Sequence, residues 1–322
     1  MGPSVKVQHL LPLAAVVLLY IVPTETKVVT SITECPDFFL DKTPPNIAGI
    51  LEKGEIQDQN RYKPICQTFN DKRTFMTLYD TLNKIPLFSA AKYRGGGEGR
   101  RPKPNWKIEP QLEQSGHNDN MKIQEKPKRA NEKKNKNENI ICNNQAGDQD
   151  YRNNPDFDRG HLFPSSYGSD QIEKMSTFTL TNIVPQQSDF NTGSWNRMEN
   201  CVKCVLNEYC INNNDKIEGF VVIGALPSNS NLNNKINIPS VLWSAFCCFS
   251  KSQNSWLYSI CPFHLIWPFH IYICSSYNNI CPTFYHICLL NYHFCPFHIY
   301  FCSSYYNICP TFYHIWPLHC HI

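Results

Sequence analysis

The sequence predicts an α+β fold with a central antiparallel sheet, and three observations support this prediction. Residues 74–79 alternate polar and apolar side chains, which is typical of a half-buried strand. A second strand is expected over 85–90, and the turn-forming residues 80–84 between the two indicate a hairpin. Residues 188–209 carry apolar side chains three and four positions apart, which predicts a helix.

The first 26 residues have the pattern of a secretory signal peptide. Lys6 precedes an apolar run from Leu10 to Val22, and a polar stretch follows. This run is shorter than the ~20 residues that span a bilayer, although a membrane anchor is the alternative interpretation. Sixteen cysteines also favour an oxidising compartment. We therefore expect residues 1–26 to be a signal peptide of a secreted protein with no stable membrane insertion.

Residues 28–250 are expected to form one globular domain. The overall content of 42% hydrophobic and 18% charged residues fits a soluble globular protein, whereas a net charge of +3 is too small to indicate a nucleic-acid partner by itself. Cys35 and Cys66 flank loop sequence and could form a disulfide, but connectivity cannot be read from sequence. Residues 115–140 are rich in Lys and Asn, which predicts a mobile insertion. That insertion is either a solvated loop or a segment that steers a polyanion.

The segment 252–322 is a tandem repeat without Asp, Glu, Lys or Arg. Residues 268–287 recur at 296–315 with two changes, and cysteines stand every seven residues within the repeat. The regularly spaced prolines are incompatible with a coiled coil. We interpret the segment as translated non-coding repeat and not as a native domain. A membrane-associating tail and a Cys/His metal array are the alternatives.

The residues that carry chemistry lie between 151 and 201. A short strand is expected to end in Asp158-Arg159-Gly160-His161, and a histidine beside arginine and glycine can act as a base near neutral pH. Taken alone, His161 could equally be a structural histidine.

The helix at 188–209 provides a second group of polar side chains. Asp189 or Asn191 is expected to cap it, and Asn191, Trp195 and Glu199 lie four residues apart on one face. The helical rise between Asn191 and Glu199 is about 12 Å, too far for both to bind one ion directly. One direct ligand, with a second group acting through water, suits a hydrated hard cation such as Mg²⁺. The start of the helix would also favour a phosphate.

Three features have simpler interpretations than a chemical role. Trp195 is better explained by helix packing than by base stacking. Cys201, Cys204 and Cys210 could bind zinc, but disulfides or free thiols fit a secreted protein better. Residues 95–97 are three glycines without the lysine of a phosphate-binding loop, which indicates a flexible turn.

The ordered motifs over 35–250 resemble the DNA/RNA non-specific endonucleases, which have the ββα-metal (His-Me finger) fold. The resemblance is carried mainly by DRGH at 158–161, TNIVPQ at 181–186 and FNTGSWNRME at 190–199, together with IPLFSA, RPKPNWKIEPQLE, FVVIGALPSN and NIPSVLWSAFCC. DRGH alone is moderately specific, and the ordered set is highly specific. The resemblance therefore implies a nuclease site within a sheet-containing domain.

The resemblance also implies roles for individual residues. His161 would deprotonate the attacking water, with Asn182 orienting the site around it. Asn191 would be the only direct protein ligand of Mg²⁺, for which Mn²⁺ could substitute, and Glu199 would hold the coordinated waters. Arg159 would contact the phosphate or its surroundings. The implied substrates are DNA and RNA, bound through their phosphates and cleaved to leave a 5′-phosphate.

The sequence departs from this family at one substrate contact. Many members carry an arginine two residues before the tryptophan that matches Trp106, and Pro104 stands at that position. Arg100 or Arg101 is the candidate substitute. A catalytically inactive extracellular protein of the same fold that binds nucleic acid or protein is the alternative function. The sequence leaves the oligomeric state open.

Overall fold

The computed structural model describes residues 27–116, 120–124, 140–152 and 154–264. The predicted signal peptide 1–26, most of the predicted insertion 115–140 and the repeat from residue 265 onward lie outside the described residues. None of the described helices is long and apolar enough to cross a bilayer.

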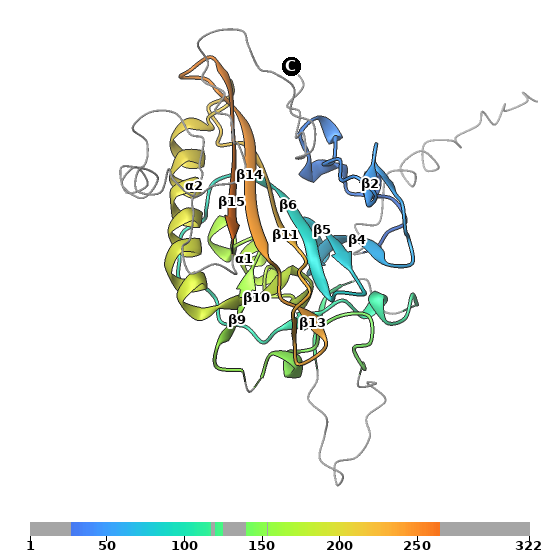
Figure 1. Cartoon of the computed structure of the whole chain (residues 1–322). Helices are drawn as coiled ribbons and strands as arrows, with labels where there is room; N and C mark the ends of the chain where they lie inside the picture. The colour runs from blue at the N-terminus through green and yellow to red at the C-terminus, as the bar shows by residue number, and fades with distance from the viewer. Residues whose placement is uncertain (1–26, 117–119, 125–139, 153, 265–322) are drawn as a thin grey trace, which may run out of the picture.

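A seven-stranded sheet forms the centre of the molecule (Figure 1), and its neighbouring strands all pair antiparallel. In spatial order its strands are β1 (Lys27–Val28), β4 (Tyr62–Phe69), β5 (Lys72–Asp80), β6 (Ile85–Tyr93), β11 (Gly219–Leu226), β14 (Val241–Ser250) and β15 (Ser255–His264). The predicted hairpin is confirmed as β5 and β6, whose register shifts between Leu78 and Tyr79. The α+β class and the antiparallel sheet are therefore as predicted.

The sheet continues past residue 250, where the sequence predicts the end of the globular domain. Strand β15 pairs with β14 over ten residues, from Val241 opposite His264 to Ser250 opposite Ser255. The first part of the charge-free segment is therefore an edge strand of the sheet. The backbone groups on one side of β15 are paired with β14, which its composition alone does not indicate.

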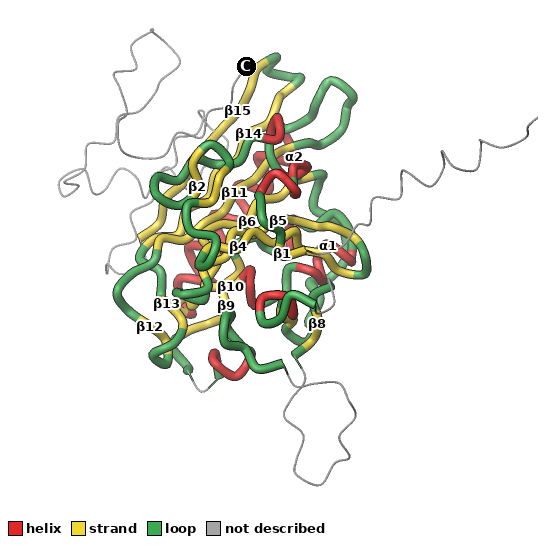
Figure 2. Tube along the Cα trace, turned by 90° about the vertical axis from the view of Figure 1, so that its right-hand side faces the viewer, coloured by secondary structure: helices red, strands yellow, loops and turns green. Residues whose placement is uncertain are grey.

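Two cores lie on opposite faces of this sheet, because successive strand residues point to opposite sides. On β11, Val221 and Ile223 join the core that contains the long helix, whereas Val222 joins the core beneath the N-terminal segment. The layers are visible when Figures 1 and 2 are compared. The sheet is therefore sandwiched between a helical layer that carries the candidate site and a layer of short N-terminal elements.

The helical layer also contains a separate pair of antiparallel strands. These are β9 (Phe157–His161) and β10 (Ile183–Gln187), followed by η9 (Phe190–Trp195) and α2 (Asn196–Tyr209). The helix predicted at 188–209 is confirmed, except that η9 is wound as a wider π-helix. Helix α1 (Gln171–Ser176) lies between β9 and β10 in the chain.

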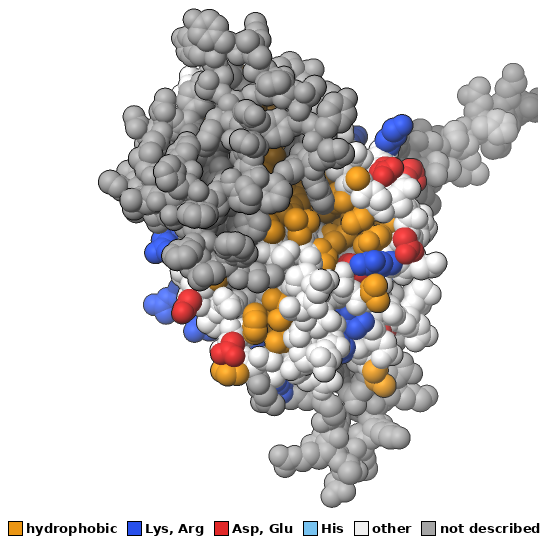
Figure 3. All heavy atoms as spheres, in the orientation of Figure 1, with side chains coloured by type: hydrophobic (Ala, Val, Ile, Leu, Met, Phe, Trp, Pro, Cys, Tyr) orange, Lys and Arg blue, Asp and Glu red, His pale blue; other side chains and the backbone are white. Residues whose placement is uncertain are grey.

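The remaining elements are short. The two-residue strands are β2 (Leu51–Glu52), β3 (Glu55–Ile56), β7 (Lys107–Ile108), β8 (Lys122–Ile123), β12 (Asn231–Leu232) and β13 (Ile236–Asn237). The 3₁₀ helices are η2 (Ile32–Glu34), η3 (Pro36–Phe38), η4 (Leu40–Lys42), η5 (Pro110–Leu112), η6 (Asp148–Tyr151), η7 (Ser165–Tyr167) and η8 (Leu180–Asn182). Apolar side chains gather on the face shown in Figure 3.

Disulfides join distant parts of the described chain. Cys35 bonds to Cys66 across 31 residues, as the sequence allowed, and Cys210 bonds to Cys248 across 38 residues. Cys201 is also disulfide-bonded, whereas Cys204 is a free, exposed thiol. The disulfide and free-thiol interpretation of these cysteines is therefore confirmed over the zinc interpretation.

Candidate active site

The hairpin of β9 and β10 places His161 at the end of a strand, opposite Ile183. A larger residue at position 160 would displace the side chain of Gln186, because a Cβ at Gly160 would lie 2.1 Å from Cδ of Gln186. Gln186 is buried, and its Nε2 donates a hydrogen bond to the backbone oxygen of His161 at 3.4 Å. The glycine of the DRGH motif therefore allows the two strands to pack closely beside the imidazole.

The imidazole of His161 is enclosed by aromatic rings and is only 6% exposed. Phe178 packs edge-on against it at 4.8 Å between ring centroids, and Trp106 lies at 5.6 Å. Among the described residues, no group bonds to its buried Nε2. Burial, reinforced by the charges of Arg101 and Lys107, lowers the pKa of His161 to about 3. The ring is therefore neutral at physiological pH, and its free nitrogen can accept a proton.

Two arginines flank this aromatic cluster. The guanidinium of Arg101 lies 5.4 Å from the ring centroid of Phe178, and that of Arg159 lies 5.7 Å from the ring centroid of Trp106. Arg159 is held in place, since its Nη2 donates to the backbone oxygen of Asp148 at 2.8 Å and forms an ion pair with that carboxylate at 2.9 Å. Arg101 is exposed and forms no hydrogen bond or ion pair with the described residues.

The structure distinguishes between the two arginines proposed to replace the missing family arginine. The charge of Arg101 lowers the pKa of both His161 and Glu199, which places its guanidinium within electrostatic range of both groups. Arg100 is also exposed, but no contact with another described residue links it to the site. Arg101 is therefore the better candidate for a phosphate ligand.

The amide of Asn191 is oriented by a residue of the DRGH motif. Its Nδ2 donates to Oδ2 of Asp158 at 3.0 Å, which leaves Oδ1 without a donor among the described residues. Asp189 occupies the N-cap of η9, as predicted, but its side chain makes no capping hydrogen bond, and Asn191 lies inside η9. The wider turn of η9 directs Asn191 to β9 instead, and π-helical turns of this kind are frequent at functional sites.

The carboxylate of Glu199 is half-buried in the first turn of α2. Burial raises its pKa to about 8, although the charge of Arg101 opposes that shift. Its backbone oxygen accepts a hydrogen bond from the hydroxyl of Tyr167 at 2.9 Å. Burial therefore outweighs the positive charge already present, and an added cation would favour the ionised carboxylate. Trp195 is 1% exposed and stacks on Phe190, which supports the packing interpretation of this residue.

Asn182 is fully buried and acts on the site only through the backbone. Its Oδ1 accepts from Ser89 Oγ at 2.9 Å and from the backbone nitrogen of Phe163 at 3.0 Å, and its Nδ2 donates to the backbone oxygens of Phe163 and Thr177. These bonds tie the segment just after His161 to β6. Asn182 is therefore placed to fix the position of His161 without touching a substrate.

The loop that carries Arg101 is closely packed, where a flexible turn was predicted. The backbone nitrogen of Gly97 donates to the oxygen of Gly168 at 2.9 Å. The buried Lys174 donates through Nζ to the backbone oxygens of Gly97 at 2.6 Å and Glu98 at 2.7 Å. Glycine is needed for close approach here, because a Cβ at Gly97 would lie 2.1 Å from the backbone oxygen of Ser169. In the sequence, this loop can be recognised by the three glycines at 95–97 that precede Arg100 and Arg101.

Replacing Gly97 with alanine is expected to destabilise the protein by about 1–3 kcal/mol, because a backbone atom must move to admit the new methyl group. The loop and Arg101 should shift with it, so nucleic-acid binding should weaken as well. Gly116→Ala is the matched control, since a Cβ there meets nothing within 4 Å. Urea unfolding of the two variants measures the difference, and equal stability would show that the loop is not packed as described.

Asn191 and Glu199 are the residues that fit a cation. Both offer oxygen, and among the described residues no three His, Cys, Asp or Glu side chains are grouped as a metal site. The free Oδ1 of Asn191 and the raised pKa of Glu199 indicate one acceptor and one carboxylate that a cation would satisfy. A site with so few protein ligands suits a hard ion that keeps most of its waters, such as Mg²⁺.

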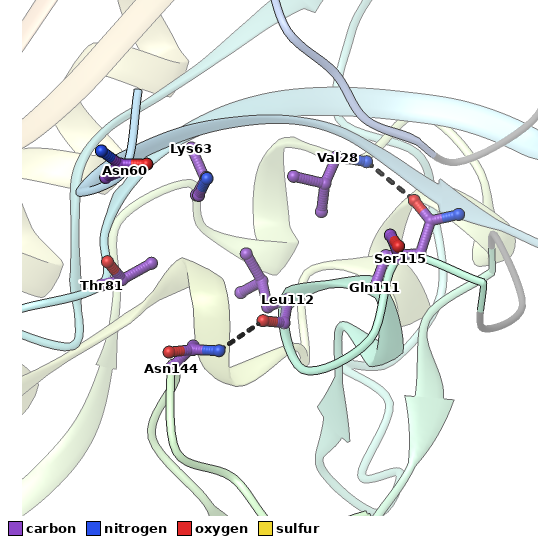
Figure 4. Close-up of a pocket in the computed structure, with 8 residues that line it drawn as sticks. All are labelled: Val28, Asn60, Lys63, Thr81, Gln111, Leu112, Ser115 and Asn144. Atoms are coloured by element: carbon purple, nitrogen blue, oxygen red, sulfur yellow. Dashed lines mark hydrogen bonds between the residues drawn. The ribbon is translucent and has the colours of Figure 1, made fainter. Parts of the chain in front are cut away.

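A separate polar pocket lies elsewhere, and none of the predicted site residues lines it (Figure 4). Its walls include Lys63, Asn60 and Thr81. Both hydrogen bonds drawn in Figure 4 join residues of the walls, from the backbone nitrogen of Val28 to Gln111 and from Asn144 to the backbone oxygen of Leu112. The pocket is therefore not part of the His161 site.

Two antiparallel strands followed by a helix, with an imidazole at the end of the first strand, define the ββα class of nuclease fold. The chain belongs to the DNA/RNA non-specific endonuclease family, whose sequence pattern matches residues 57–262. The resemblance of its motifs to this family is thereby confirmed.

Individual relatives are similar over the same region. The human endonuclease domain-containing 1 protein is 30% identical over 219 residues, which is 67% of this chain and 39% of the relative. The mouse protein of the same name is 29% identical over 215 residues, 67% of this chain and 38% of the relative. The chain thus spans about two fifths of the length of the curated relatives it matches. A crystal structure of the EndoG/EndoGI complex is similar with a TM-score of 0.42 and 16% identity, over 60% of this chain and 72% of that chain.

Proposed function

We propose that this protein is a secreted, sugar-non-specific endonuclease that hydrolyses phosphodiester bonds of DNA and RNA with His161 as general base and a hydrated Mg²⁺ ion. The observation that supports this proposal most directly is the buried, neutral imidazole of His161. Its Nε2 has no partner among the described residues, and the charge of Arg101 acts on it. Family membership supports a nuclease at a coarser level.

Each residue of the site has a separate role in this proposal. His161 accepts the proton of the attacking water through Nε2, which has no bonding partner among the described residues. Arg101 binds the phosphate oxygens and offsets the charge that develops on them. Asn191 would hold the cation directly through Oδ1, and Glu199 would hold its waters. When bound, Mg²⁺ stabilises negative charge on the non-bridging and leaving oxygens of the phosphate.

Arg159 and Asn182 support these groups without bonding to the phosphate. The ion pair with Asp148 holds Arg159 against Trp106, so its charge contributes to the field around the site. Asn182 positions the backbone after His161. Contacts to phosphate and not to base edges would allow both DNA and RNA as substrates.

The disulfides Cys35–Cys66 and Cys210–Cys248 support secretion, because such bonds persist in oxidising compartments. We propose a signal peptide at 1–26 and a nuclease domain that begins near residue 28. Strand β15 extends this domain to His264. The remaining repeat is proposed not to be a native domain.

A digestion assay tests the proposed function. The purified secreted chain should degrade both plasmid DNA and single-stranded RNA in millimolar Mg²⁺ or Mn²⁺, and should stop when EDTA is added. Persistence of cleavage in EDTA would contradict the metal requirement, and cleavage of only one nucleic acid would contradict the lack of sugar specificity.

The alternative is a protein of the same fold that binds nucleic acid without cleaving it. Pro104 favours this alternative, because it stands where many family members carry a phosphate-binding arginine. Binding of a fluorescent oligonucleotide without any cleavage in Mg²⁺, Mn²⁺ or Ca²⁺ would support it over the enzyme.

A further inference from the structure

Lys203 lies on α2 one turn beyond Glu199. Residues four apart share a face of an α-helix and are separated by about 6 Å along its axis. The ammonium group of Lys203 lies over the glycine loop, because a Cβ at Gly96 would be 2.4 Å from Cε and 2.7 Å from Nζ of Lys203. Lys203 therefore borders the same loop that carries Arg101, one helical turn from Glu199.

The charge of Lys203 is not neutralised within the described part of the chain. It is half-buried and forms no ion pair or hydrogen bond with any described residue. Burial and the neighbouring Lys174 both lower its pKa. Lys174 itself is bonded to the backbone oxygens of Gly97 and Glu98 and to no carboxylate of the described residues. Two ammonium groups thus meet at the glycine loop without an anion.

We propose that Lys203 binds the phosphate next to the one that is cleaved, and so makes a strand with a flanking phosphate a better substrate than an isolated phosphodiester. This inference rests on the proposed function. The scissile phosphate would lie between Arg101, His161 and Glu199, and one helical turn is comparable to the separation of neighbouring phosphates in an extended strand. A cationic track beside the site is the usual way in which proteins follow a single-stranded backbone.

This arrangement explains why the loop is built from glycines. A side chain at position 96 would occupy the space of the Lys203 ammonium, and one at position 97 would push the loop away from Ser169. The glycines therefore let the loop pack against Ser169 and leave room for the Lys203 ammonium. Lys203 is thus assigned to substrate binding and not to the chemical step.

Binding measurements test this assignment without requiring cleavage. Anisotropy of a fluorescent single-stranded DNA 20-mer is recorded in EDTA at several KCl concentrations, with the full secreted chain. Lys203→Gln should reduce the slope of log Kd against log salt by about 0.7 and raise Kd about fivefold at ~0.1 M salt, as expected for one lost phosphate contact. Lys203→Arg should keep the wild-type slope. Lys53→Gln is the matched control, because it removes one positive charge in the turn between β2 and β3. This variant should also keep the wild-type slope.

Small substrates then test whether Lys203 contacts a phosphate next to the scissile one. The dinucleotide TpT contains only the scissile phosphate, whereas pTpT and TpTp each add one flanking phosphate. Wild-type protein should cleave one of the two longer compounds with a severalfold lower KM than TpT, and Lys203→Gln should abolish that gain without changing kcat. An unchanged salt slope, or a flanking-phosphate gain that survives in Lys203→Gln, would overturn the inference. If the wild-type protein binds no oligonucleotide at all, both the inference and the proposed function fail, whereas binding with unaltered Lys203→Gln behaviour removes the inference alone.

Discussion

His161→Ala is expected to lower kcat for plasmid DNA and for RNA by roughly 10²- to 10⁴-fold, the usual contribution of a positioned general base. The physical reason is that the neutral Nε2 of His161 has no bonding partner among the described residues and is the free base that the site provides. The measurement is the initial rate of hydrolysis at saturating nucleic acid and Mg²⁺. Binding of an oligonucleotide in EDTA should be nearly unchanged, because Arg101 and Lys203 remain.

Chemical rescue separates loss of the base from damage to the fold. Removing the imidazole leaves a space next to Phe178 and Trp106 that free imidazole can enter, so added imidazole should restore part of the rate. Thermal unfolding of His161→Ala should show a folded protein. Wild-type rates in this variant would end the general-base assignment, and loss of nucleic-acid binding would instead point to a structural role.

Asn191→Ala is expected to lower activity by about 100-fold or more at millimolar Mg²⁺ and to raise the Mg²⁺ concentration needed for half-maximal rate. The alanine removes the amide oxygen, the one direct cation ligand proposed, and releases Asp158 from its hydrogen bond. The rate is measured over a Mg²⁺ titration, with Mn²⁺ binding followed by electron paramagnetic resonance as a direct readout.

The matched control is Asn196→Ala, five residues further along. Asn196 is exposed on α2, and its side-chain oxygen accepts a hydrogen bond from Nδ2 of Asn200 at 3.0 Å, so its side chain has no contact with the proposed cation site. This variant should keep both the rate and the Mg²⁺ dependence. If Asn191→Ala behaves in the same way as this control, the cation must be held by other residues, and the site would need to be reassigned.

Local sequence patterns predicted one hairpin of the central sheet and the helix that carries Asn191 and Glu199. Alternation over 74–79 and the turn at 80–84 led to the β5–β6 hairpin, and the apolar spacing over 188–209 led to α2. Such patterns succeed because each reports which side of one element is buried. They did not predict the π-helical start of that helix, in which Asn191 is hydrogen-bonded to Asp158 on another element.

In two segments, amino-acid composition predicted the structure less well than the spacing of apolar residues did elsewhere. The charge-free segment after residue 252 contains β15, which pairs with β14 over ten residues. The three glycines at 95–97 suggested flexibility, yet the backbone oxygen of Ser169 and the side chain of Lys203 pack against them. Glycine favours either a mobile loop or a close approach, and only the neighbouring atoms decide between the two.

The sequence by itself determined the α+β class and the order of the motifs, because both follow from residues that are close together in the chain. It also led to the proposal of one imidazole, one amide and one carboxylate as the groups that carry the chemistry. Only the tertiary structure decided that Arg101 and not Arg100 faces His161, that Asp158 orients Asn191, and that Lys203 lies unpaired among the described residues over the glycine loop. Those relations join segments far apart in the chain, and they arise from packing that no local pattern records.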